Sequence, residues 1–189
     1  NTIVGPSQYP SKRTVDTIAK YRAQGHRFFI ASGRPLFSAT EMADRIGPDL
    51  DVICSNGTIS RVDEKLDVQH LTPRALEGIY RVAHEYQLPQ YFFTQSQVLY
   101  LRPMTKGISE DSQVRIAGED PNHYVAIDSV EQLKRWSDRI INAIAFDQDP
   151  ANLAKARVAM AQVQDIDTSS SSPDNIEITG HGINKATAI

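Results

Sequence analysis

The chain has very little sulfur and no long apolar run. Its 189 residues include one cysteine, Cys54, so no internal disulfide can form and we expect a reducing, cytoplasmic location. No apolar stretch approaches the length that crosses a bilayer. A large excess of one charge is also lacking: the formal net charge of −3 argues against nucleic acid or an anionic membrane as the main partner.

What the chain does have is the composition of a globular protein, with 40% hydrophobic and 23% charged residues. Its length suffices for one core, or for a core with a smaller inserted domain. The first residue is Asn1 rather than Met, and a helical pattern is beginning where the sequence stops at Ile189. We therefore expect the protein to continue beyond both ends. Nothing in the pattern specifies an oligomeric state.

One strand-to-helix turn stands out. A short apolar run rich in strand formers, Phe28–Ala31, leads into Ser32, Gly33 and Arg34, and Pro35 then opens a helical pattern. The first N–H groups of a helix lack intrahelical partners, and the helix dipole favours negative charge there. The turn is therefore a candidate phosphate site.

The segments around this turn alternate between helix and strand. Helical spacing over residues 11–25 precedes it, a second apolar strand follows at Asp51–Cys54, and glycines punctuate the turns. This βαβ order predicts an α/β protein with a parallel sheet, in which ligands bind at the carboxyl ends of the strands. Ser32 and Asn56 each follow such an end, so we expect them to converge on one pocket.

After residue 57 the order changes. Residues 58–71 and 90–102 are typical of two hairpins, with a helix beginning at Thr72 between them. Helices and strands then alternate to about residue 170, while the polar residues 103–122 carry no clear pattern. This order is typical of an α+β module rather than of a parallel sheet.

The change in order predicts an inserted α+β domain over residues 62–172. The first domain would then combine residues 1–61 with residues 173–189. The serine run at residues 169–172 is interpreted as a flexible linker through which the chain returns to the first domain.

The candidate site residues each have an ordinary and a functional interpretation. Ser32 could simply cap the following helix, or its hydroxyl and the Gly33 N–H could bind a phosphoryl oxygen. Arg34 offers a planar set of donors suited to phosphate, although arginine is also common on surfaces. Asn56 precedes a glycine, and this pair fits a tight turn as well as a side chain that faces a ligand.

Lys185 follows a glycine-rich turn and begins an alanine-rich helical pattern. Most lysines are surface charges, but one at a helix N-terminus opposes the dipole and is better explained by a bound anion. His181 lies in the same turn and is kept as a loop residue that could reach a substrate. The five histidines show no metal-binding spacing; Cys54 is interpreted as a core residue, and Asp147 and Asp149 as loop and N-cap residues rather than magnesium ligands.

Three segments carry a family resemblance. Residues 31–35 read Ala-Ser-Gly-Arg-Pro, residues 55–58 read Ser-Asn-Gly-Thr, and residues 175–189 contain Asn-Ile-Glu-Ile followed by Gly-Ile-Asn-Lys-Ala-Thr-Ala-Ile. In this order they resemble the A-T-G-R-P, N-G-A and E-I…G-V-x-K-G-x-A-L motifs of the haloacid dehalogenase (HAD) superfamily, in its Cof-type sugar-phosphatase branch. The resemblance implies a Rossmann-like core, incomplete here at both ends, with an inserted α/β cap.

The resemblance also implies a role for each candidate residue. Ser32 would bind the transferring phosphoryl group, supported by the Gly33 amide. Lys185 would neutralise charge on the nucleophile and on the phosphoryl oxygens. Arg34 and Asn56 would shape the substrate pocket. The expected activity is hydrolysis of a small phosphorylated metabolite, such as a sugar phosphate, through an aspartyl-phosphate.

Two motifs of that family are not in the sequence. The D-x-D motif that supplies the nucleophilic aspartate is expected before Asn1, and the acidic motif that helps to hold Mg²⁺ is expected after Ile189. The Mg²⁺ ligands should therefore lie outside residues 1–189. We expect residues 1–189 expressed alone to be inactive and poorly stable, because a shortened core exposes sheet edge and apolar surface.

Two other functions remain open at this point. One is a phosphometabolite-binding protein of the same fold that has lost the nucleophile, which the residues before Asn1 would decide. The other is an unrelated doubly wound nucleotide-binding fold. That fold predicts a glycine-rich phosphate loop after the first strand, and Val-Gly-Pro-Ser at residues 4–7 is a poor match.

Overall fold

The computed structural model describes residues 9–47, 49–102 and 124–188. The chain forms two compact units, which are treated separately below. Unit 1 comprises Asn1–Val68 and Asn184–Ile189, and unit 2 comprises Gln69–Ile183. Both mix helices with strands, so the predicted α/β class is confirmed.

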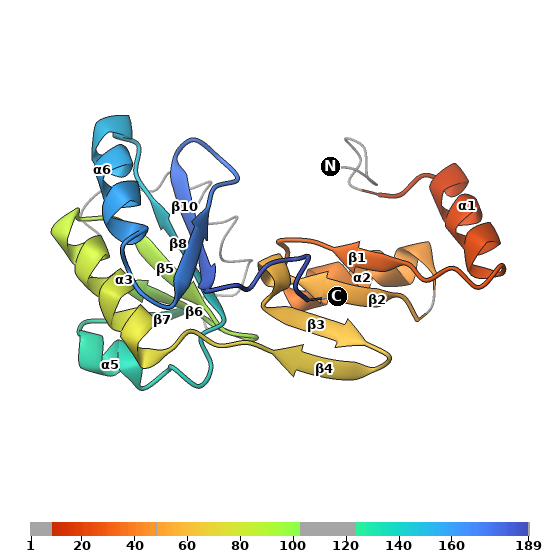
Figure 1. The fold of residues 1–189 in the computed structure, drawn as a ribbon, viewed down its shortest axis with the longest axis horizontal. Coiled ribbons are helices and arrows are strands. Elements are labelled where there is room, and N and C mark those ends of the chain that lie inside the picture. The colour runs from red at the N-terminus through yellow and green to blue at the C-terminus, as the bar shows by residue number, and fades with distance from the viewer. Residues whose placement is uncertain (1–8, 48, 103–123, 189) are drawn as a thin grey trace. The chain divides into compact units, whose positions relative to one another are not determined.

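Unit 1 contains a four-stranded sheet in the order β1-β2-β3-β4 (Figure 1). Strands β1 and β2 are parallel, whereas β2–β3 and β3–β4 are antiparallel. The bounds of its helices and strands are α1 Lys12–Arg22, β1 Phe29–Ala31, α2 Leu36–Ile46, β2 Asp51–Cys54, the 3₁₀ turn η1 Ser55–Gly57, β3 Ile59–Val62 and β4 Lys65–Val68.

The helices of unit 1 begin and end where the sequence predicts. The hydroxyl oxygen of Ser11 accepts a hydrogen bond from the N–H of Thr14 and so caps α1. Helix α2 connects the two parallel strands, and its buried residues, Ala39, Ala43 and Ile46, lie on one face. This β1-α2-β2 unit places the carboxyl ends of β1 and β2 next to each other.

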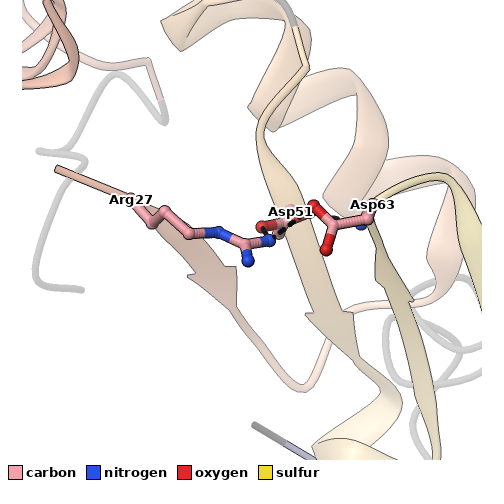
Figure 2. A network of polar contacts seen from close by, with 3 residues as sticks. All are labelled: Arg27, Asp51 and Asp63. Atoms are coloured by element: carbon pink, nitrogen blue, oxygen red, sulfur yellow. Dashed lines mark hydrogen bonds and ion pairs between the residues drawn. The ribbon is translucent and has the colours of Figure 1, made fainter. Parts of the chain in front are cut away.

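An ion-pair network ties the opposite end of this sheet together (Figure 2). The guanidinium of Arg27, just before β1, donates to Asp51 at 2.6 Å and to Asp63 at 2.8 Å. Asp51 also accepts from the N–H of Asp63 at 3.0 Å. The network joins the start of β1, the start of β2 and the turn of the β3–β4 hairpin.

Unit 2 is built on a six-stranded sheet in the order β7-β6-β5-β8-β10-β9. Only β6 and β7 are parallel within it. Helices α3, α5 and α6 lie on one face of the sheet (Figure 1). The bounds are α3 Pro73–Glu85, β5 Gln90–Phe93, β6 Val98–Leu101, β7 Tyr124–Ile127, α5 Val130–Lys134, β8 Asn142–Phe146, α6 Pro150–Met160, β9 Ile166–Ser169 and β10 Asn175–Gly180.

The core of unit 2 lies between these helices and the sheet. Leu76 and Ile79 of α3, Phe92 of β5 and Leu153 of α6 are among its buried members. The other face of the sheet carries a second, aromatic cluster around Tyr91. Burial raises the pKa of the Tyr91 phenol to about 12.

The division into units differs from the predicted boundaries at residues 62 and 172. The hairpin β3–β4 pairs with β2 and belongs to unit 1. Strands β9 and β10 pair with each other, and β10 also pairs with β8, so residues 173–183 belong to unit 2. The prediction missed both because antiparallel pairing to distant strands leaves no mark on local sequence.

The serine run at residues 169–172 is not a linker between domains. It forms the connection between β9 and β10, where the side-chain oxygen of Asn175 accepts from the N–H groups of Ser171 and Ser172. The Arg157 guanidinium donates to the Asn175 carbonyl at 2.6 Å and to that of Pro173. Short polar side chains are used here to satisfy backbone groups in a turn.

Several predictions fall outside the described residues: the initial strand and loop at residues 2–7, the unassigned segment 103–122 and the final residue. Within the described part of the chain, no helix combines the length and the apolar character that a membrane span requires.

Candidate active site

The first two predicted segments meet at the carboxyl ends of β1 and β2. The N–H of Ser32 donates to the Ile53 carbonyl at 2.9 Å, which extends the pairing of the two strands by one residue. The N–H of Ser55 then donates to the Arg34 carbonyl at 2.8 Å, and the N–H of Asn56 to the Ser32 carbonyl at 3.3 Å. The loop at residues 32–34 (the serine loop) and the turn at residues 55–57 (the asparagine turn) therefore meet, as the sequence predicts.

Gly33 is needed where these two segments touch. A Cβ at this position would lie 2.9 Å from the side-chain oxygen of Asn56, closer than real Cβ contacts allow. A side chain at this position would require the Asn56 amide to turn away from the backbone of the loop. Asn56 therefore faces the loop that carries Ser32 and Arg34.

Ser32 does not cap α2, which corrects the ordinary interpretation of that residue. The N-cap of α2 is Pro35, whose side chain makes no capping hydrogen bond. Instead the Ser32 hydroxyl oxygen accepts from the N–H of Arg34 at 3.1 Å, a bond that fixes the loop and leaves the O–H proton to donate elsewhere. The Arg34 guanidinium donates to the Ser38 hydroxyl at 3.3 Å.

The turn after β2 has an unusual backbone. Ser55, Asn56 and Gly57 all have positive φ values, of 49°, 61° and 101°. Two non-glycine residues in succession in the left-handed region cost conformational energy, of order 1–3 kcal/mol each. The hydrogen bonds to the Ser32 loop and the Thr58 hydroxyl, which donates to the Ser55 carbonyl at 2.9 Å, hold the turn in this form.

The third predicted segment packs against this same turn. A Cβ at Gly57 would lie 2.3 Å from the carbonyl carbon of Asn184, 2.4 Å from its oxygen and 2.8 Å from the backbone nitrogen of Lys185. The chain at residues 184–185 therefore passes directly over the α-carbon of Gly57. The first two motif segments and the Asn184–Ile189 part of the third lie in unit 1, whereas residues 175–183 of the third belong to unit 2. Residues 55–57 contact both the Ser32 loop and residues 184–185.

Asn184 organises the turn that carries Lys185. Its side-chain oxygen accepts from the N–H groups of Ala186 at 2.9 Å and Thr187 at 3.2 Å. The Thr187 hydroxyl in turn accepts from the N–H of Asn184 at 3.0 Å. This reciprocal pattern has the form of a capping box. The described residues continue it as turns to Ala188, and Lys185 is exposed to solvent.

His181 belongs to unit 2, whereas the residues described above belong to unit 1. Its ring nitrogen Nδ1 lies 3.0 Å from a carboxylate oxygen of Asp167, and the N–H of Gly182 donates to the same carboxylate at 2.8 Å. The backbone N–H of Gly182, and then His181, lower the pKa of Asp167.

Cys54 is confirmed as a core residue, and Asp147 and Asp149 are confirmed as a loop residue and an N-cap residue. Cys54 is fully buried, and desolvation raises the pKa of its thiol to about 11. Asp149 is the N-cap of α6, and the Asp147 carboxylate accepts from the Asp149 N–H at 2.9 Å.

Two contributors were not identified as site residues from sequence. The sequence predicts Gly57 only as part of a tight turn, and it shows Asn184 only as one residue within the third motif. The Asn184-x-x-Thr187 spacing is a readable capping signal, whereas nothing in the local sequence could reveal which backbone segment presses on Gly57.

This arrangement defines a class of protein: an α/β protein whose oxyanion-type donors gather at the carboxyl ends of parallel strands. A family model for haloacid dehalogenase-like hydrolases matches residues 1–189. The chain belongs to this family, as the three motifs imply.

Similar proteins agree with this assignment. The MG265 protein of Mycoplasma genitalium, which is named as a phosphatase, is 23% identical over 98% of this chain and 69% of its own length. The solved structure of SMU.1108c from Streptococcus mutans is 17% identical with a TM-score of 0.74 and covers 98% of this chain and 69% of its own. The HAD subclass IIB sugar phosphatase BT4131 is 15% identical with a TM-score of 0.70, with 98% and 69% coverage.

The fit of the described residues to a magnesium ion can be tested directly. Among them, no group of three His, Cys, Asp or Glu side chains is placed to hold a metal. The predicted site residues Ser32, Arg34, Asn56 and Lys185 carry hydroxyl, guanidinium, amide and ammonium groups and no carboxylate, the group through which proteins usually bind Mg²⁺. We therefore derive no step through a metal ion bound to these residues.

Proposed function

We propose that the protein is a magnesium-dependent phosphatase that hydrolyses a small phosphorylated metabolite, such as a sugar phosphate. The observation that carries the proposal is the meeting of residues 32–34, 55–57 and 184–185 in one unit through backbone contacts. At this end of the sheet, the Asn184–Lys185 backbone lies directly against Gly57. The family of the chain and its sugar-phosphatase neighbour support the same reaction class.

The residues described above would supply the anion-binding half of the reaction. The Ser32 hydroxyl and the Gly33 N–H would donate to phosphoryl oxygens, and Lys185 would neutralise the charge that develops there. Such preorganised donors contribute most when they act on the transition state rather than on the substrate. Arg34 and Asn56 would border the pocket and contact the rest of the substrate.

The other half of the reaction is expected from the family motifs outside residues 1–189. The aspartate nucleophile and the acidic magnesium ligands would lie there, so residues 1–189 alone should show no turnover. The experiment therefore uses the full-length protein that contains this chain.

The test measures phosphate release from a panel of sugar phosphates and other phosphomonoesters, with Mg²⁺ and with chelator. Lys185→Ala should lower kcat/KM by about 100-fold or more, the usual cost of one transition-state donor. Ser32→Ala should lower it by a smaller factor, whereas Ser32→Thr retains the hydroxyl and should stay active. The matched control is Lys155→Ala, which removes an exposed lysine from α6 of unit 2.

The outcomes separate the two functions of this fold. Magnesium-dependent turnover that collapses in Lys185→Ala and persists in Lys155→Ala would support the phosphatase. A folded protein that binds inorganic phosphate but releases none from any ester would support the non-catalytic binding protein instead.

A further inference from the structure

We infer that Asn184 is a positioning residue that holds Lys185 in place beside the Ser32 loop. The inference rests on the proposed function, because it assigns a task to a residue next to the proposed catalytic lysine. It concerns how the lysine is fixed rather than what the lysine does.

Lys185 is fixed through its backbone on one side by the turn after β2. The carbonyl group of Asn184 and the nitrogen of Lys185 lie so close to the Gly57 α-carbon that any side chain there would displace them. Gly57 itself is buried, and its turn is tied to the Ser32 loop by the N–H of Asn56. The position of the lysine backbone is therefore coupled to the position of the serine loop.

On the other side Lys185 is fixed by the Asn184 side chain. That side chain accepts hydrogen bonds from Ala186 and Thr187, and Thr187 accepts one from the Asn184 N–H. Lys185 is the residue enclosed by these bonds, so its backbone dihedral angles are set by them. Without the side-chain oxygen, two N–H groups at the start of the turn would lose their acceptor.

The place of Asn184 in the chain shows why such a clamp is needed. Ile183, the residue before it, belongs to unit 2, where its N–H donates to the Gly180 carbonyl at 3.0 Å and its carbonyl accepts from the Thr179 hydroxyl at 3.1 Å. Asn184 is the first residue of the returning unit 1 segment. Lys185 thus lies one residue from the point where the chain changes units, and Asn184 separates it from that point.

The experiment compares three substitutions in the full-length protein. Asn184→Ala removes the acceptor and should lower kcat by about 10- to 100-fold and raise KM by a smaller factor, since small misplacements of a catalytic group carry costs of this size. Asn184→Ser should recover most of kcat, because serine caps as well as asparagine does. The matched control is Ser11→Ala, which removes the cap of α1 in the same unit but away from the site.

A second readout does not depend on turnover. Binding of inorganic phosphate, measured by calorimetry, should weaken about 10-fold in Asn184→Ala and stay unchanged in Ser11→Ala, and Asn184→Ser should bind nearly as the parent does. Phosphate binding should weaken because the Lys185 ammonium, once misplaced, loses part of its charge-assisted contact with the anion.

The two proposals fail in different ways. If the parent protein releases phosphate and Lys185→Ala abolishes this, but Asn184→Ala keeps kcat and phosphate affinity, the positioning role is wrong and the phosphatase stands. If Asn184→Ala and Ser11→Ala lose melting temperature and activity alike, Asn184 is a structural cap only. A parent protein that neither turns over esters nor binds phosphate would overturn both proposals.

Discussion

The contacts that stabilise unit 1 internally differ from those that stabilise unit 2. In the described part of unit 2, helices α3, α5 and α6 pack onto one face of a six-stranded sheet and bury an apolar cluster between them and the sheet. The part of unit 1 that forms the candidate site relies on close backbone contacts, with glycines at Gly33 and Gly57 under neighbouring segments. Apolar packing tolerates shape changes better than backbone contact does, because side chains can move and the backbone cannot.

This difference predicts which substitutions affect stability and which affect activity. In unit 2 a lost methyl group costs free energy of unfolding in proportion to the cavity that it leaves. At the site in unit 1 a misplaced backbone moves several donors at once, since the three segments share hydrogen bonds and contacts. Substitutions should therefore separate into those that change stability and those that change activity.

The largest stability change should come from the core of unit 2. Phe92 is fully buried at the centre of that core, and Phe92→Ala should lower the free energy of unfolding by about 3–5 kcal/mol. Urea denaturation followed by circular dichroism measures this change. Val158→Ala on the exposed face of α6, where the side chain is 68% exposed, should change stability by less than about 0.5 kcal/mol. Equal effects of the two substitutions would contradict the packing described for unit 2.

The largest activity change from a glycine should come from Gly57. In the full-length protein, Gly57→Ala forces the Asn184–Lys185 backbone away and should lower kcat by about 100-fold. The control is Gly25→Ala, which also has a positive φ, of 88°, but has no atom within 4 Å of the new methyl group. That control should cost about 1–2 kcal/mol of stability and leave kcat unchanged. If both variants kept full activity, the close contact at Gly57 would not matter for function.

A smaller effect is expected at Gly78, a glycine contact within unit 2. A Cβ at Gly78, in the middle of α3, would lie 2.4 Å from Cγ1 of Val163. Overpacking should make Gly78→Ala less stable by about 1–3 kcal/mol, partly offset by the better helix propensity of alanine. Val163→Ala removes the obstructing methyl groups, so the double variant should lose less stability than the two single losses added together. Simple additivity in thermal melts would show that the two residues do not touch.

The smallest effect, and the only one that depends on pH, should come from Asp167. The Gly182 N–H and His181 lower the pKa of this carboxyl, so its contribution to stability is present above the ordinary carboxyl pKa of about 4 and is lost as pH falls below it. Because the side chain is 46% exposed, Asp167→Asn should cost less than about 1 kcal/mol at pH 7. That cost should shrink in urea titrations as the pH falls below about 4.

A matched carboxyl tests this pH dependence. The control is Asp138, whose carboxylate is 73% exposed and lies 3.8 Å from the Arg139 guanidinium, so that Asp138→Asn should change stability at pH 7 by less than about 0.5 kcal/mol. A difference between parent and Asp167→Asn that stayed constant from pH 7 to pH 2.5 would exclude ionisation of Asp167 as its cause.

Much of the local structure follows from sequence because its causes are local. Ser11 and Thr72 cap the helices that they were predicted to begin, and Asp149 caps α6. Strand β2 has the predicted bounds, Asp51–Cys54, because an apolar run ends there at a glycine-containing turn. The pairing of β10 with β8 was missed, since a short apolar strand fits either sheet on pattern alone.

The candidate site also has features that the sequence shows and contacts that it does not show. The sequence shows the residue types of the serine loop, of the asparagine turn and of the turn at residues 184–187. Their order is enough to indicate the family. The bond from Ser55 to the Arg34 carbonyl and the contact of Gly57 with Asn184 are not visible, because they join segments that no sequence spacing brings together.

The sequence by itself determined the elements, their caps and the three motifs, because each depends on residues a few positions apart. Only the tertiary structure decided that residues 32–34, 55–57 and 184–185 meet within unit 1, that β9 and β10 join unit 2, and that Lys185 lies one residue after the change of unit. These depend on which distant backbone groups find partners, and that choice is made by the packing of the whole chain rather than by neighbouring residues.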